Sequence, residues 1–304
     1  MKSLLLTLII LLLILTSNWS YAAIQSMIKD KYFQNGIGVI NIPDQQSIDD
    51  VLELPNDSVA EYNWKLAQWN SQSSLAGSTR TVDTNGFYAW EDQFKSLKIS
   101  PWGTLELTVN GFNEYDGILK TVADPWPHML IKQRIHDPNT SLSIAEADKI
   151  KLSFSSKLIS RDLNGPNLNT STSQYTMYLT IQNLNLNSAG YGDYLWFGIP
   201  IYDRRYEFIA HAVAGDPGTS KMIYGNATED FTNISMHSQT WVDYDADILP
   251  LIQSALIEAW KRGYLPDSKC FTDYYIGGFN VGYEVSNLDI HTIRLKNLSM
   301  EFHH

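Results

Sequence analysis

Two glutamates on the polar face of predicted strands have the clearest potential for chemistry. Glu106 lies in segment 104–110 and Glu284 in segment 279–286, and apolar and polar side chains alternate in both segments. Successive side chains of a strand leave opposite faces, so both carboxyls should project away from the apolar face. If the two carboxyls converge, they can cleave a glycosidic bond, one as general acid and the other as nucleophile or base. Glu106 and Glu284 are therefore candidate catalytic residues; the alternative is that they are solvated acids.

Aromatic residues accompany polar ones at several predicted strand ends. The chain has 9 Trp and 17 Tyr residues. Indole and phenol rings stack on the CH faces of sugars, while amide, carboxylate and guanidinium groups bind the hydroxyls. The pattern favours a saccharide surface, with use of the rings as core residues as the alternative. The candidate ligand-binding residues are Trp102, Trp126, His128, Trp196, Asp203, Arg205 and Trp241.

A metal site and a lyase site are further hypotheses. Asp243, Asp245 and Asp247 offer alternating oxygen ligands before a predicted helix, which makes them a candidate calcium site, with helix capping as the alternative. Apart from this structural calcium, no cofactor is expected.

Two histidines, His128 and His211, are candidate bases for a lyase reaction in which Tyr202 or Tyr206 is the acid; the alternative is that they are structural histidines. The sequence contains no Walker A loop, Gly-x-Gly-x-x-Gly, His-Glu-x-x-His or Gly-x-Ser-x-Gly motif.

Charge and cysteine content exclude several classes of protein. The net charge of −11 argues against a nucleic-acid partner, and also against anionic membrane surfaces and strongly acidic polymers as ligands. Cys270 is the only cysteine, so an intrachain disulfide is excluded.

The first 23 residues have the features of a signal peptide. Lys2 precedes an apolar run over 4–15 that is interrupted only by Thr7, and small residues follow at 20, 22 and 23. This run is shorter than a membrane-spanning helix, so we expect cleavage after Ala22 or Ala23; an uncleaved N-terminal anchor is the alternative. The prediction is a periplasmic or secreted chain with one domain, 24–304, and no membrane span after cleavage.

The elements that must position the candidate residues are mostly strands. Frequent turn dipeptides such as Asn-Gly and Asp-Gly separate β-prone segments, which is typical of an antiparallel β-sandwich. One amphipathic helix is predicted over 248–262, with Pro250 in its first turn and Gly263 at its end. A shorter helix is predicted over 47–54. Strands are also predicted at 128–135, 149–159, 174–182, 194–201, 205–212, 236–243 and 290–302.

The last third of the chain resembles the closing strands of concanavalin-A-like jelly rolls. The residues that carry the resemblance are the helix, the following Gly263 and Pro266, the segment 275–285 and the final segment 293–299. This superfamily includes legume-type lectins and many β-glucanases and polysaccharide lyases. The resemblance implies an all-β jelly-roll sandwich and a carbohydrate ligand. The Glu-x-Asp-x-x-Glu run of one large glucanase group is absent, so no catalytic residue is carried over.

These patterns predict an exported protein that binds a polysaccharide or oligosaccharide at an aromatic-lined concave sheet. Cleavage of that saccharide stays open, by a glycoside hydrolase or, as second choice, a polysaccharide lyase. The alternative is a structural or adhesive exported β-sandwich without a sugar site.

Overall fold

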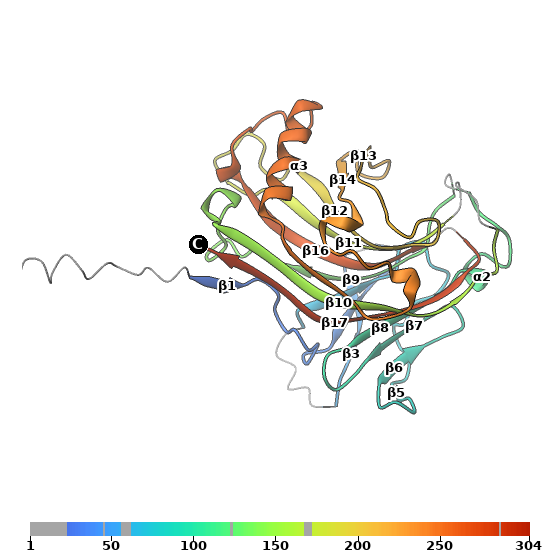
Figure 1. Ribbon diagram of the computed structural model, residues 1–304. Helices are drawn as coiled ribbons and strands as arrows, with labels where there is room; N and C mark the ends of the chain where they lie inside the picture. Colours follow the sequence, from blue (N-terminus) through green and yellow to red (C-terminus); the bar gives the residue numbers. More distant parts are fainter. Residues whose placement is uncertain (1–22, 45, 56–61, 122–123, 167–171, 286) are drawn as a thin grey trace, which may run out of the picture.

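A computed structural model describes residues 23–304 except 45, 56–61, 122–123, 167–171 and 286. Two large β-sheets pack face to face, and Figure 1 shows them as two layers with α3 at one end. Most neighbouring strands are antiparallel; the pairs β2–β4 and β12–β14 are parallel. The predicted antiparallel β-sandwich is confirmed. The predicted leader, apart from Ala23, lies outside the described residues.

The first sheet, sheet A, has the strand order β15-β10-β17-β8-β7-β6-β5, and β1 pairs with β17. Its strands are β1 (Ile24–Ser26), β5 (Thr81–Val82), β6 (Tyr88–Glu91), β7 (Lys95–Ile99), β8 (Leu105–Asn110), β10 (Lys149–Asp162), β15 (Val242–Asp247) and β17 (Ile290–His303).

The second sheet, sheet B, has the order β13-β14-β12-β11-β16-β9-β4-β2-β3. Its strands are β2 (Ile37–Ile40), β3 (Ile48–Leu52), β4 (Trp64–Ala67), β9 (His128–Arg134), β11 (Ser173–Asn183), β12 (Tyr194–Asp203), β13 (Ala212–Gly215), β14 (Met222–Gly225) and β16 (Tyr274–Val285). The helices are α2 (Gly111–Glu114), α3 (Leu249–Lys261) and the 3-10 turns η1 (Ile144–Glu146), η2 (Thr228–Asp230), η3 (Met236–Ser238) and η4 (Phe271–Asp273).

The predicted long helix is confirmed as α3. It buries Ile252, Leu256 and other apolar side chains, and it contacts β10 of sheet A and β12 of sheet B. The carboxylate of Asp247 accepts a hydrogen bond from the backbone N–H of Leu249 at the start of α3, 3.1 Å. Gly263 follows the helix at φ +85°, where only glycine is unstrained. The helix therefore joins the two layers at one end, and no described helix is long and apolar enough to cross a membrane.

Three local predictions are wrong. Segment 47–54 contains strand β3, because its backbone pairs with β2 and this tertiary pairing overrides the helical pattern. Most of 205–212 is a turn and loop, and β13 begins only at Ala212. Segment 236–243 begins with the turn η3, in which Ser235 accepts from the N–H of His237, before β15 starts.

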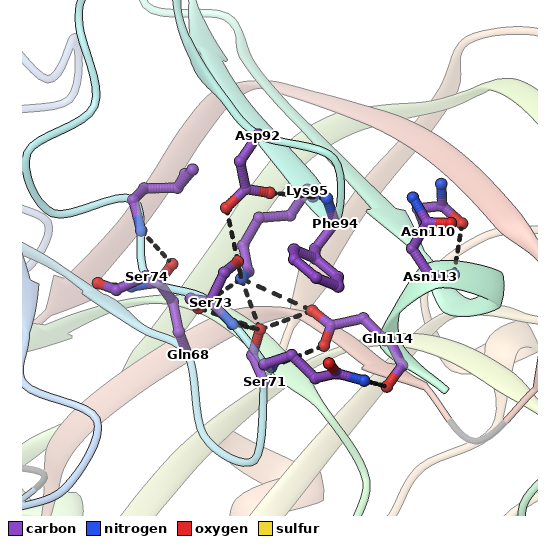
Figure 2. Close-up of polar contacts among 12 residues, drawn as sticks. Gln68, Ser71, Ser73, Ser74, Asp92, Phe94, Lys95, Asn110, Asn113 and Glu114 are labelled. Carbon is purple, nitrogen blue, oxygen red and sulfur yellow. Dashed lines mark hydrogen bonds and ion pairs between the residues drawn. The ribbon is translucent and has the colours of Figure 1, made fainter. Parts of the chain in front are cut away.

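A buried ionic cluster attaches the loop after β4 to sheet A (Figure 2). The Lys95 ammonium donates to Ser71 Oγ, 2.5 Å, and to Ser73 O and Oγ, 2.6 and 2.8 Å. It also lies 3.6 Å from Glu114 Oε1, and both side chains are 1% exposed. Burial lowers the pKa of Lys95, an effect that the negative charge of Glu114 opposes. An ammonium has three N–H groups, and all three are taken, so the cluster is structural.

Replacing Lys95 by Met should destabilise the fold by about 3 kcal/mol, because Glu114 would keep a buried charge without its cation. Urea unfolding of the chain measures this loss, and Lys95→Met/Glu114→Gln should recover part of it. The control is Lys261→Met, whose side chain is 77% exposed; it should change stability by less than about 0.5 kcal/mol. Equal stability of the two single variants would contradict the structural role.

Candidate functional site

The outward face of sheet B presents several polar and titratable side chains. On β16 the side chains of Phe279, Val281 and Tyr283 are buried in the core. The alternate residues Asn280 and Glu284 therefore project from the opposite face. Their neighbours across the sheet follow from the strand register: Tyr178 and Lys132 flank Asn280, while Gln174 and His128 flank Glu284.

Glu284 is the carboxyl at the middle of this face. Its Oε1 lies 3.7 Å from His128 Nε2, and each side chain is about one-fifth exposed, at 21% and 20%. Burial raises the pKa of Glu284; the nearby positive charge of His128 opposes the rise, and the negative charge of Asp216 adds to it. A raised pKa favours the protonated carboxyl, which is the form that can donate a proton to a bound molecule.

One end of the face is a cavity of about 500 Å³ over β11, β12 and β14. Tyr178 is one of the residues that line this cavity. A Cβ at Gly198 would come within 2.9 Å of the Tyr178 ring, so the glycine leaves room for the ring to lie across β12. Trp196 is an edge-on neighbour of Tyr178, with ring centroids 6.0 Å apart. Besides Tyr178, the side chains that line the cavity include Tyr206, Phe208, His211 and Asn226. We call this the aromatic end.

Two predicted binding residues, Asp203 and Arg205, line the aromatic end but bind each other. Arg205 donates from Nε to Asp203 Oδ1, 3.0 Å, and from Nη2 to Oδ2, 2.7 Å. Thr172 and Gln174 also donate to this carboxylate. Burial alone would raise the pKa of Asp203, but the hydrogen bonds from Arg205 outweigh it and hold the pKa below its usual value. The Arg205 guanidinium lies over the Tyr206 ring, 5.0 Å from the centroid, so the pair positions that ring.

The opposite end of the face is a second cavity, of about 510 Å³, over β2, β4 and β9. We call it the basic end, because its lining includes Lys29, Lys65, Lys132, Arg134 and His136.

Trp69 lies between the basic end and Glu284. Its ring is 5.7 Å from the His128 ring, and Lys132 Nζ is 5.8 Å from its centroid. The indole therefore links the catalytic candidate to the lysines.

Several buried polar atoms on this face have no hydrogen-bond partner within the described part of the chain. They are Trp69 Nε1, Trp126 Nε1, His128 Nδ1, His136 Nδ1, Asn226 Oδ1 and Asn280 Oδ1. A buried donor or acceptor without a partner is costly, and most native ones are satisfied. Seven other described residues, such as the core residues Tyr175 and Tyr283, have such atoms too; on this outward face a bound ligand would be able to supply the missing partners.

The structure does not bring Glu106 and Glu284 together. Glu106 is on β8 of sheet A, and Arg294 Nε and Lys98 Nζ lie 2.6 and 3.9 Å from its carboxylate. It projects from the outward face of sheet A, because Leu105 and Leu107 on either side of it are buried in the core. The pairing of these two acids is therefore wrong, and Glu106 is an ion-paired structural residue.

The four predicted tryptophans separate into two groups. Trp196 is on the outward face of sheet B, and Trp126 lies in the loop before β9, where its carbonyl accepts from Asn70 Nδ2 at 3.0 Å. Trp102 is in the β7–β8 turn and is 75% exposed. Trp241 precedes β15 of sheet A, and Lys296 Nζ lies 4.0 Å from its ring centroid. None of the four lines either cavity, and Trp196 neighbours the lining residue Tyr178.

The three aspartates of the calcium hypothesis do not converge. They alternate along β15, where Asp243 accepts from Ser155 Oγ, Asp245 pairs with Lys151, and Asp247 caps α3. In the described ranges, no group of three His, Cys, Asp or Glu side chains is arranged to hold a metal ion.

Sequence reasoning missed three residues of this face. Tyr178 lies in a predicted strand, where its alternation with the core residues Met177 and Leu179 is the signal that could have found it. Trp69 follows β4 directly, so only the pairing of β4 with β9 places it beside His128. Asp216 lies in the β13–β14 turn, far from Glu284 in sequence, and its negative charge contributes to the raised pKa of Glu284.

Comparison with solved structures finds similar chains among carbohydrate-active enzymes. A xyloglucanase domain of a type three effector from Sinorhizobium fredii, in complex with cellobiose, has 9% identity and a TM-score of 0.40, and covers 77% of this chain and 97% of its own. A family 12 xyloglucanase from Bacillus licheniformis has 10% identity and a TM-score of 0.41, with 78% and 99% covered. A family 11 xylanase from Neocallimastix patriciarum has 10% identity and a TM-score of 0.39, with 79% and 100% covered.

At these identities and TM-scores, the similarities carry no residue roles over to this chain. No family model matches the sequence, and no curated protein is similar to it.

Replacing Glu284 by Gln should stabilise the protein at pH 8. Because the folded chain binds the Glu284 proton more tightly than the unfolded chain, folding is most favoured below the unfolded pKa of about 4.3 and loses stability as pH rises. The Glu284→Gln variant avoids this loss, so its melting temperature should exceed the parent's at pH 8 and approach it near pH 4. Glu106→Gln should destabilise at pH 8, because it breaks the ion pair with Arg294. If both variants raise the melting temperature at pH 8, or both lower it, this account of Glu284 and Glu106 is wrong.

Proposed function

We propose that this protein binds a polysaccharide along the outward face of sheet B. The observation that carries the proposal is the set of partnerless buried polar atoms among aromatic rings, with Trp69 Nε1, His128 Nδ1 and Asn280 Oδ1 at its centre. Aromatic rings bind the CH faces of sugars, and these polar atoms would bind hydroxyl groups. A cavity at each end of the face leaves room for several sugar units. The proposed leader at 1–23 would export the chain to a compartment where polysaccharides occur.

Hydrolysis of the bound polysaccharide is a second candidate function, favoured by the raised pKa of Glu284. A protonated Glu284 would donate its proton to the departing glycosidic oxygen. Asp216 is near enough to raise that pKa, so it is the carboxylate that would act as base or nucleophile. The acid pair proposed for hydrolysis is therefore Glu284 with Asp216, and Glu106 has no part in it.

Binding should depend on the rings of the outward face. Trp69→Ala and Trp196→Ala should each weaken the affinity for the best ligand of an oligosaccharide panel by about tenfold, because each removes a stacking surface. Isothermal titration calorimetry measures the dissociation constants. Trp102→Ala is the matched control and should bind as the parent does. If Trp102→Ala weakens binding as much as Trp69→Ala, the site is elsewhere.

Cleavage should depend on Glu284. Glu284→Gln should lower the rate of reducing-sugar release by at least about 100-fold, because general acid catalysis is lost, while glycan affinity stays within about threefold. Asp216→Asn should have a similar effect on the rate. Glu301→Gln, on β17 of sheet A, is the control and should keep the parent rate. Full release by Glu284→Gln would exclude this hydrolysis and leave the binding proposal intact.

A further inference from the structure

We propose that the bound polysaccharide is anionic and that the basic end recognises its carboxylate or sulfate groups. This inference rests on the proposed function, because it names the substrate class of the same face. Five cationic or titratable basic side chains, Lys29, Lys65, Lys132, Arg134 and His136, line the cavity, and no carboxylate is part of its described lining.

Several cations elsewhere in the chain are neutralised by carboxylates. Lys151 and Lys221 pair with Asp245 and Asp193, and Arg294 pairs with Glu106. Among the described residues, no ion pair and no hydrogen bond to a carboxylate is formed by the Lys65, Lys132 or Arg134 side chains. Their charge is therefore available to a bound anion.

Two of these lysines oppose each other across the sheet. Lys65 on β4 is the register partner of Lys132 on β9. Like charges directly opposite on a sheet destabilise it. Burial lowers the pKa of Lys132, and the positive charge of Lys65 lowers it further. The fold keeps an unfavourable pair that a bound anion would convert into a favourable one.

The position of the lysines fits a substituent on a sugar ring. Lys132 Nζ lies 5.8 Å from the Trp69 centroid, so a sugar stacked on this indole would hold its ring substituents near Lys132. Beyond the lysines, a Cβ at Gly38 would come within 2.7 Å of the Tyr62 ring, so this glycine lets a second ring lie low over β2. Tyr62 also lines the basic end. A ring and a cation thus lie side by side there, which a neutral glycan would not require.

The rest of the molecule has a net negative charge, in contrast to the basic end. The net charge is −11, so the cavity is a local positive region on an acidic protein. Charge of one sign in a cleft attracts ligands of the opposite sign and orients them. An anionic chain would therefore bind with its charged groups at the basic end.

The test compares anionic with neutral oligosaccharides, and oligogalacturonate with its methyl ester is the pair matched in sugar backbone. Oligogalacturonate, its fully methyl-esterified form, a sulfated carrageenan oligosaccharide and cellohexaose are titrated into the parent, Lys65→Met/Lys132→Met, and the control Lys151→Met. An anionic oligosaccharide should bind the parent at least about tenfold more tightly than the neutral ones, and the double variant should lose about tenfold for that ligand alone. The affinity for this ligand should decrease when the salt concentration is raised from 50 to 500 mM. The preference for galacturonate or for carrageenan identifies carboxylate or sulfate as the group bound.

The outcomes separate the two proposals. If cellohexaose or the methyl ester binds as tightly as the anionic ligands, and the double variant changes nothing, this inference is overturned while polysaccharide binding stands. If none of the four ligands nor any other glycan binds, the proposed function itself is wrong.

Lys132→Met should also raise the melting temperature without ligand, because the opposed charges are removed. A lower melting temperature would mean that Lys132 is structural, against the inference.

Discussion

The packing of sheet A against sheet B determines where this chain can place polar chemistry. Each strand of a sandwich turns every second side chain to the core, and on β11 and β16 these are residues such as Met177 and Val281. The intervening residues, Tyr178, Asn280 and Glu284, must then leave from the other face. Because β9, β11 and β16 are neighbours, their outward residues form one continuous surface. The site depends on this alternation, so any shift of register by one residue would bury Glu284 and expose the core.

The sequence predicted this alternation and could not predict which sheet each strand joins. Segments 104–110 and 279–286 have the same pattern, and both were correctly identified as strands with an outward glutamate. One joins sheet A and the other sheet B, a choice made by long-range pairing of β8 with β17 and of β16 with β11. Glu106 then meets Arg294, whereas Glu284 meets His128. Local pattern therefore identifies a carboxyl that projects outward, and only topology decides whether it has a cation to neutralise it.

The helix could be predicted from local sequence, whereas the missed aromatic residues depend on strand pairing. The periodicity of α3, its proline and its terminal glycine are local signals, and they predicted its bounds within one residue. Trp69 has no such signal, because its place beside His128 depends on the antiparallel pairing of β4 with β9. Trp102 and Trp241 had stronger sequence context and lie away from both cavities. Ring type and polar neighbours are thus insufficient evidence for a binding surface; the face of the sheet must also be known.

Charge illustrates why a whole-chain property can mislead about a site. The value of −11 argued against strongly acidic ligands, since a ligand far from the surface senses the sum of all charges. Salt screens charges that lie more than about 8–10 Å away, so a bound ligand interacts mainly with the nearby groups. At the basic end those groups are cations, and two of them, Lys65 and Lys132, are held opposite each other by the register. The acidic remainder of the surface then restricts an anionic ligand to this one entrance, so the negative sum strengthens selectivity at the site.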